Sequence, residues 1–173
     1  MNSKIINSRF VFISIAVFVA AISRIFPHIP NFTPIAAMAL FGAACMNNKV
    51  LAVAVPLLAM IISDAIIGFH NTMIYVYVSF GIISLIGFGL RNRVKPANIF
   101  VASLISSILF FLVTNFGVWM SIGATNGATG LVGTYTLGVP FFRMTLLGDL
   151  FYNTILFGAL YLAQLRFPVL AKV

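Results

Sequence analysis

The stretch SRIFPHIPNFTPIAAMALFGAAC, residues 23–45, decides how the rest of this sequence is interpreted. Its first twelve residues gather an arginine, a histidine, an asparagine and three prolines, and long apolar runs lie on both sides. Proline ends or begins helices, because it lacks an N–H and its φ is fixed. We therefore predict that one helix ends near Phe26 and that a second begins at Pro34, with Thr33 as its N-cap.

The composition around this stretch is that of a membrane protein. Of the 173 residues, 62% are hydrophobic and 7% are charged, whereas about a quarter of a soluble domain is charged. This predicts one integral membrane domain over residues 1–173, a multi-pass protein of the cytoplasmic membrane in contact with its lipid. Cleavage of the first apolar run as a signal peptide is disfavoured, because five more such runs follow.

Two function classes are set aside on charge and cysteine content. The net charge is +8, but the basic residues are scattered at the ends of apolar segments, so we expect no nucleic-acid partner. Cys45 is the only cysteine, which excludes a disulfide within the chain and makes a zinc site unexpected. No metal and no cofactor is expected.

The apolar runs predict an all-α bundle of six transmembrane helices. Their expected positions are residues 10–26, 34–46, 50–68, 72–90, 97–120 and 141–165. With both termini in the cytoplasm, eight of the ten basic residues fall on the inner side, which is the charge bias of membrane proteins. Those eight are Lys4, Arg9, Lys49, Arg91, Arg93, Lys95, Arg166 and Lys172.

The second predicted helix is too short to cross the membrane. About 13 residues give roughly 20 Å, against a hydrocarbon core of about 30 Å. If the end near Lys49 lies at the cytoplasmic face, the beginning lies inside the membrane, and residues 26–33 must dip inward. Irregular backbone at that depth has to be buried or line a wet cavity, into which this helix would point free N–H groups. Such helix ends hold anionic groups in transporters with broken helices.

Polar residues that interrupt the apolar pattern fall in the outer half of the predicted bundle. As candidates for substrate binding we take Arg24, His28, Asn31, Asp64, His70, Asn115, Trp119, Arg143 and Asp149. The two aspartates are the only acids, and an intramembrane carboxylate costs about 2.5–3.5 kcal/mol. We expect them to face protein or water. Thr145, Asp149, Tyr152 and Asn153 share one face of the last helix by their spacing.

Structural interpretations of the same residues stay open. The aspartates could form ion pairs that fix helix packing, the histidines could be plain interfacial residues, and Trp119 could be an aromatic-belt anchor. The glycine- and threonine-rich residues 121–140 are expected to connect the last two helices, either as a mobile cover over the cavity or as a plain linker. Small residues such as Ala16 and Ala20 could serve internal packing or a partner protein.

Several phrases carry a resemblance to a known family. They are PNFTPIAAMALFGAA from residue 30, VPLLAMIISDAIIGFHN from residue 55, TNFGVW from residue 114 and PFFRMTLLGDLFYNTILFG from residue 140. Over about residues 10–165 the chain resembles the substrate-binding S components of energy-coupling factor (ECF) transporters. It is closer still to an uncharacterised bacterial group of transport proteins related to them.

The resemblance implies uptake of a vitamin or another scarce nutrient. It also implies that residues 24–33 and 121–140 cover the ligand, and that Ala16 and Ala20 dock onto a transmembrane coupling subunit driven by two ATPase subunits. The chain has no phosphate-binding loop, so we do not expect it to hydrolyse ATP itself.

Three functions are compared. The first is the binding subunit for uptake of a small polar nutrient with a negative or acceptor group. The second is a transporter or channel that acts alone, with Asp149 as a proton-coupling carboxylate. The third, a membrane-embedded enzyme, is the least favoured, because no HExxH, GxSxG or metal-type cluster is present. We expect the protein not to be an enzyme.

Overall fold

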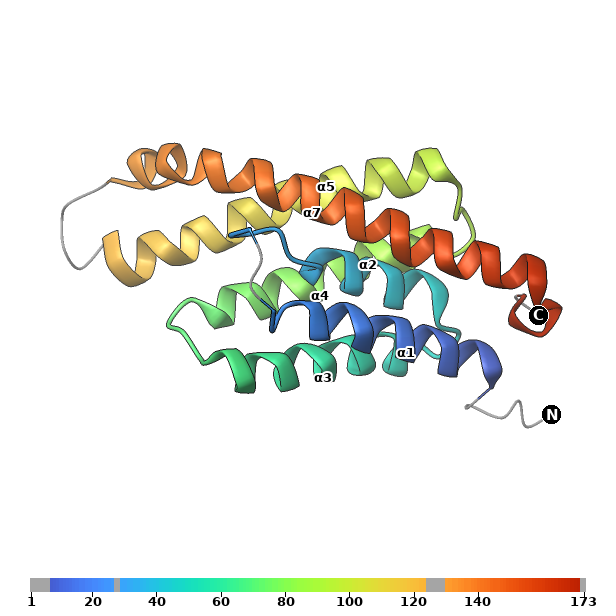
Figure 1. Cartoon of the computed structure of the whole chain (residues 1–173). Coiled ribbons are helices and arrows are strands. Elements are labelled where there is room, and N and C mark those ends of the chain that lie inside the picture. Colours follow the sequence, from blue (N-terminus) through green and yellow to red (C-terminus); the bar gives the residue numbers. More distant parts are fainter. Residues whose placement is uncertain (1–6, 27–28, 124–129, 172–173) are drawn as a thin grey trace.

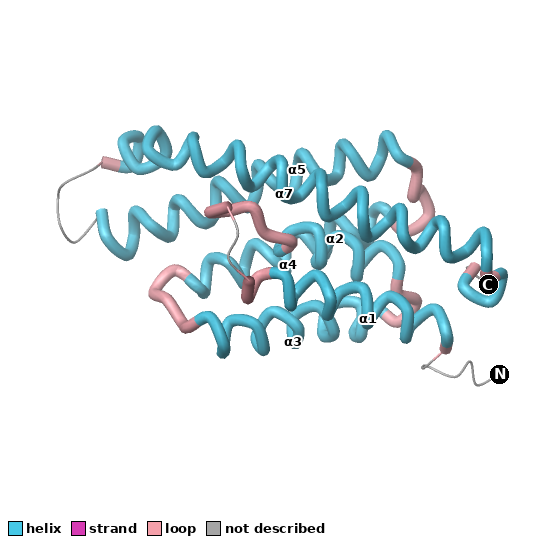
Figure 2. Tube along the Cα trace, in the orientation of Figure 1, coloured by secondary structure: helices cyan, strands magenta, loops and turns pink. Residues whose placement is uncertain are grey.

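The computed structural model describes residues 7–26, 29–123 and 130–171. All secondary structure in these ranges is helical, and six α-helices form one bundle (Figures 1 and 2). They are α1 (Ser8–Ser23), α2 (Ile35–Cys45), α3 (Lys49–Ile67), α4 (Met73–Leu90), α5 (Pro96–Val118) and α7 (Leu131–Arg166). A π-helical turn, η1 (Trp119–Gly123), follows α5, and a 3-10 turn, η2 (Pro168–Leu170), follows α7.

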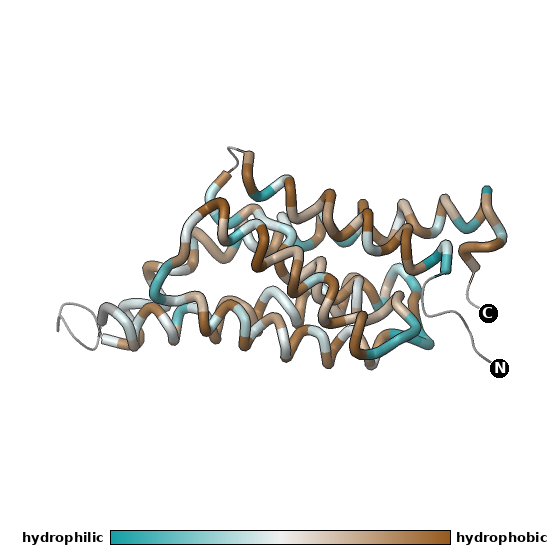
Figure 3. Tube along the Cα trace, turned by 90° about the horizontal axis from the view of Figure 1, so that it is seen from below, coloured by the Kyte–Doolittle hydropathy of each residue, from teal (hydrophilic) through white to brown (hydrophobic). Residues whose placement is uncertain are grey.

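Four of the helices are long and apolar enough to cross a membrane: α3, α4, α5 with the start of η1, and α7. The other two are shorter, since α1 has 16 residues and α2 has 11. Much of the outer surface is apolar, with exposed side chains such as Ile15, Ile66 and Leu162. Figure 3 shows the hydrophobic colour along the helices and the hydrophilic colour mostly near their ends. These features are those of a membrane protein.

The two ends of the bundle are easily distinguished in Figure 1. We call the end that carries the N- and C-termini the termini end. It also holds the α4–α5 connection around Arg91, and Arg9 donates a hydrogen bond to the carbonyl of Leu170 there. We call the opposite end, with the Gly68–Thr72 turn and η1, the far end.

The short helix α2 is the centre of the bundle. All eleven of its residues are buried, and it contacts each of the other five helices. The prediction of a short second helix is confirmed. The preceding loop packs against α7, where the Phe32 ring lies 5.4 Å from that of Phe151 and 5.9 Å from that of Tyr152, measured between ring centroids. Its inward dip into the membrane stays a prediction.

Side chains from other helices form hydrogen bonds with backbone N–H and carbonyl groups at the two ends of α2. The N–H of Ala37, in its first turn, hydrogen-bonds to the carboxyl group of Asp149 on α7. At the other end, Arg9 donates to the carbonyl of Cys45, and Arg91 donates to those of Ala43 and Met46. An acid at the N-terminus and cations at the C-terminus are the arrangement that the helix dipole favours.

The expected N-cap of α2 was wrong. Pro34 takes the N-cap position, and no side chain of the loop caps the helix. Thr33 is therefore not the N-cap. The carboxyl group of Asp149 reaches the first turn from another helix and accepts from the Ala37 N–H. Of the free N–H groups that this helix end was expected to present to a cavity, that of Ala37 is bonded to Asp149.

The largest correction concerns residues 121–140. The predicted connection is helical from Leu131 onward, so α7 has 36 residues and contains Pro140. At 1.5 Å per residue this helix is about 54 Å long, well beyond a hydrocarbon core of about 30 Å. Contacts with α5 outweigh the weak helix propensity of this segment, because the Tyr135 hydroxyl donates to the carbonyl of Leu112 and its ring lies 5.7 Å from that of Phe111. A cover formed by the whole of 121–140 is ruled out.

Candidate functional site

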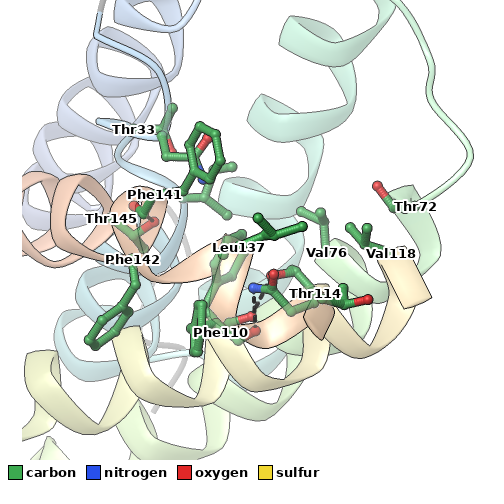
Figure 4. Close-up of a pocket in the computed structure, with 16 residues that line it drawn as sticks. Thr33, Thr72, Val76, Phe110, Thr114, Val118, Leu137, Phe141, Phe142 and Thr145 are labelled. Atoms are coloured by element: carbon green, nitrogen blue, oxygen red, sulfur yellow. Dashed lines mark hydrogen bonds between the residues drawn. The ribbon is translucent and has the colours of Figure 1, made fainter. Parts of the chain in front are cut away.

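A cavity of about 600 Å³ opens at the far end of the bundle, between α4, α5, α7 and the loop before α2. It is the best candidate for a binding site, because ligand pockets have volumes of about 300–1,000 Å³. Figure 4 shows it running from Thr145 and Phe142 at one end to Thr72 and Val118 at the other. Its size suits a small organic molecule.

The walls are apolar and aromatic, with neutral polar groups among them. Phe110, Phe111, Phe141 and Phe142 provide the aromatic surface, and the rings of Phe111 and Phe142 lie 4.9 Å apart. The polar lining consists of Asn31, Thr33, Thr72, Thr114, Asn115, Thr134 and Thr145. None of the described residues that line the cavity carries a charge.

Glycines shape this cavity by letting elements approach. A Cβ at Gly138 on α7 would collide with the side-chain oxygen of Asn115. At Gly148 it would lie 3.1 Å from the backbone nitrogen of Thr33 and 3.2 Å from the Cα of Phe32. Gly138 thus leaves room for the Asn115 amide, whose nitrogen donates to the carbonyl of Phe111 at 2.9 Å. Gly148 lets α7 touch the loop before α2.

Two of the nine predicted binding residues, Asn31 and Asn115, line the cavity. Asn31 has a φ of 63°, a left-handed conformation that asparagine tolerates better than most residues. His28 lies outside the described residues. The other six, Arg24, Asp64, His70, Trp119, Arg143 and Asp149, are not in the lining. The expected cluster of charged groups around one ligand is therefore wrong for this cavity.

Arg24 and Asp64 form a separate buried pair on the other side of α2. Their charged groups make a salt bridge, and the two side chains are 9% and 6% exposed. Arg24 also donates to the hydroxyl of Ser63, and the Tyr77 hydroxyl donates to Asp64 at 2.8 Å. This network joins the end of α1 to α3 and α4. Arg24 and Asp64 thus form an ion pair between helices, which was the structural alternative to substrate binding.

The remaining predicted residues lie apart from one another. His70 is exposed and its ring nitrogen is 3.0 Å from the hydroxyl of Thr72. Trp119 begins η1 and its ring lies 5.7 Å from that of Phe116. Arg143 was expected to start the last helix, but it lies well inside α7 with an exposed side chain. The position of Arg143 reflects the longer α7, which residue spacing in the sequence does not show.

The predicted polar face of α7 is confirmed. Thr145, Asp149 and Asn153 are all buried, and Tyr152 is partly buried with its hydroxyl 2.9 Å from that of Ser23. Thr145 lines the cavity. Asp149, one turn further along, accepts a hydrogen bond of 2.6 Å from the Ser107 hydroxyl on α5.

Sequence reasoning missed most of the cavity wall. The aromatic residues of α5 and α7 and the threonines at 72, 114 and 134 gave no signal, because phenylalanine and threonine are ordinary in membrane helices. In the part of the chain that the structure describes, no group of three or more histidines, cysteines or acids could hold a metal ion.

A family comparison covers nearly the whole chain. The pattern of DUF6580, described as a family of unknown function, matches residues 4–170. The chain belongs to the DUF6580 family. No curated protein and no solved structure was found to match it. The family membership names no activity, so the function has to be argued from the cavity.

Proposed function

We propose that this DUF6580 protein binds a small, uncharged polar molecule in the far-end cavity and takes part in its uptake into the cell. The observation that carries the proposal is the cavity itself, about 600 Å³ in volume and lined by amides, hydroxyls and aromatic rings without a charged side chain. Such a lining suits a ligand with hydrogen-bonding groups and a flat apolar body. The anionic group expected from the sequence finds no cationic partner there.

The orientation is part of the proposal. With the termini end in the cytoplasm, the cavity at the far end opens toward the exterior, where a scarce nutrient would be captured. The basic residues Arg91, Arg93 and Lys95 in the α4–α5 connection would then lie on the inner side, in agreement with the charge bias of membrane proteins.

The energy source defines two versions of the proposal. In the first, the chain is a binding subunit like an ECF S component and acts with a coupling subunit and ATPase subunits. In the second, it is a carrier that acts alone, which is supported by a second cavity at the termini end. Purification from the native membrane separates the two. An ATPase should accompany the protein in the first version, and gradient-driven uptake into liposomes should be seen in the second.

Solute binding is tested by blocking the cavity. Native mass spectrometry of the purified wild type is expected to show a bound small molecule. The Thr114→Phe variant places a large ring in the lining, at a residue whose hydroxyl donates only to the carbonyl of Phe110 in its own helix. It should lose the bound molecule.

The matched control is Thr136→Phe. Thr136 donates in the same way to the carbonyl of Val132, but it is exposed and does not line the cavity. This variant should keep the molecule at wild-type occupancy. Equal occupancy in both variants would show that the ligand binds elsewhere.

A further inference from the structure

A second, larger cavity opens at the termini end, with a volume of about 1210 Å³. It lies between α5, α7 and the α4–α5 connection. Its polar lining includes Arg9, Arg91, Lys95, Ser103, Asn153 and Gln164. The bundle therefore has two hollows that enter from opposite ends along the seam between α5 and α7.

The two cavities come close to each other inside the bundle. On α7, the far-end cavity reaches Thr145 and the termini-end cavity reaches Leu150. Five residues of helix span about 7.5 Å. On α5, the corresponding limits are Phe110 and Ser103, about 10 Å apart by the same rise. A short barrier separates the cavities, and Asp149 and Ser107 lie in it.

This barrier contains buried polar side chains. Asp149 is 1% exposed and accepts its hydrogen bond from Ser107. One turn nearer the termini end, the Asn153 amide nitrogen donates to the hydroxyl of Ser103 at 2.9 Å. The Asn153 side-chain oxygen is buried without a hydrogen-bond partner, and the residue lines the termini-end cavity. A water molecule or another donor in that cavity would satisfy it.

Ser107 is placed to pass a proton. Its hydroxyl oxygen lies 2.6 Å from the Asp149 carboxyl oxygen and 3.0 Å from the carbonyl of Ser103. A hydroxyl has a single proton to donate. Both contacts are hydrogen bonds at the same time only if Asp149 is protonated and donates to Ser107. When Asp149 is ionised, the Ser107 proton turns toward it instead.

Among the described residues 7–26, 29–123 and 130–171, no cation is paired with Asp149, in contrast to Asp64. Within their bounds, neither α5 nor α2 has a charged side chain. The titratable thiol of Cys45 lies at the C-terminal end of α2, whereas Asp149 contacts the N-terminal end. On α1, Arg9 is bonded to carbonyl groups at the termini end. On α7, Arg143 is exposed and the Tyr152 hydroxyl contacts Ser23. The carboxyl group is therefore free to exist in both protonation states.

We infer that Asp149, with Ser107, is a proton-transfer gate between the two cavities, so that the protein moves protons across the membrane. Water in one cavity gives a proton to the Asp149 carboxylate. The neutral carboxyl group then releases that proton to water in the other cavity. One proton enters and one leaves, so the cycle returns Asp149 to its starting state. The inference rests on the two cavities and needs no identified solute.

The experiment measures proton flux. The purified full-length protein is reconstituted into liposomes that contain a pH-sensitive dye, and a potassium gradient with valinomycin sets an inside-negative potential. Acidification inside the wild-type liposomes should exceed that in protein-free liposomes. The Asp149→Asn variant should fall to the protein-free level, because its amide keeps an acceptor for Ala37 but does not bind and release a proton at Asp149.

A second pair of variants keeps the test valid if Asp149→Asn fails to fold. Ser107→Ala should lower the flux, because it removes the contact with Asp149. Ser84→Ala is the control, since Ser84 is equally buried and donates only to the carbonyl of Phe80 on its own helix. It should conduct like the wild type.

Two results would overturn the inference: no flux above protein-free liposomes in the wild type, or wild-type flux in a folded Asp149→Asn protein. The solute proposal fails by a different measurement, namely a bound molecule that persists in Thr114→Phe.

Discussion

At the scale of single residues, the two acids of the chain have opposite surroundings. Asp64 faces the Arg24 guanidinium and the Tyr77 hydroxyl, so its charge is matched by a buried cation. Among the described residues, the donors to Asp149 are neutral, namely the Ser107 hydroxyl and the Ala37 N–H. An ion pair fixes helix packing, whereas an unmatched carboxyl group inside a membrane is more often functional.

The Arg24–Asp64 pair should make a large contribution to stability. Arg24→Ala leaves a buried carboxylate without its cation, which costs about 3–5 kcal/mol. We expect the variant to unfold at a clearly lower temperature in detergent. A thiol-reactive fluorescent dye can report this, because the only cysteine, Cys45, is 2% exposed and reacts when the protein unfolds.

The control for this prediction removes both charges. In the Arg24→Met, Asp64→Leu double variant no buried charge is left unmatched, so most of the lost stability should return. An Arg24→Ala protein that unfolds at the wild-type temperature would mean that the pair contributes little.

Sequence reasoning selected these charged residues but did not show their partners. The scarcity of charge marked Arg24, Asp64 and Asp149 as important, because a charged group in a membrane needs a reason. Which groups meet depends on how the helices pack around α2, and the sequence has no pattern that fixes it. The charged residues were therefore assigned to one cluster, while the structure places them on two sides of the central helix.

At the scale of elements, the position of α2 depends on close backbone approach. A Cβ at Gly87 on α4 would lie 2.6 Å from the Cβ of Ala43 and 2.7 Å from the carbonyl oxygen of Leu40, both on α2. Gly42 on α2 would similarly crowd Pro56 and the carbonyl of Ala52 on α3. Backbone cannot move aside as a flexible side chain can, so these contacts are sensitive to one methyl group.

Gly87→Ala should therefore be destabilising. Overpacking of this kind costs about 1–3 kcal/mol, measured by the same dye assay. Gly89→Ala is the matched control on the same helix, because nothing lies within 4 Å of a Cβ built there. It should be neutral or slightly stabilising, since alanine favours helix over glycine by about 1 kcal/mol. Equal losses in both variants would contradict the close α2–α4 contact.

The carbonyl groups at the end of α2 give a second prediction for this element. Arg91 donates to Ala43, Met46 and Asn47, and its guanidinium lies 4.8 Å from the centre of the Phe88 ring. Arg91→Gln should lower the free energy of unfolding by about 1.5–3 kcal/mol, the value of hydrogen bonds from a charged group. Arg93→Gln, at an exposed position two residues later, should have little effect.

Most helices could be predicted from the sequence. The exception is the start of α7, and it has a physical cause. For α3, α4 and α5 the predicted bounds lie within two residues of those observed. The start of α7 was missed because Gly133, Gly138 and Pro140 all disfavour a helix on intrinsic grounds. Packing of Tyr135 and Gly138 against α5 overrides that preference, and such contacts between distant segments leave no periodic signal.

At the scale of the whole molecule, the direction of the proposed uptake depends on which end faces the cytoplasm. The far-end cavity has an uncharged lining, whereas the termini-end cavity has three basic residues in its lining, Arg9, Arg91 and Lys95. A basic inner side and a neutral outer side are what the charge bias predicts. The orientation itself can be tested without knowing the solute.

Cysteine labelling in intact cells provides that test, in a Cys45→Ala background that has no other thiol. Asn71 lies in the exposed turn at the far end, and Arg93 lies in the exposed connection at the termini end. A membrane-impermeant maleimide should label Asn71→Cys in intact cells, and it should label Arg93→Cys only after the membrane is permeabilised. The reverse pattern would place the uncharged cavity on the cytoplasmic side, and the protein would then be an exporter or would bind its solute from within the cell. Because both positions belong to one helical bundle with its termini at one end, labelling at these two sites is sufficient to fix the direction of both cavities.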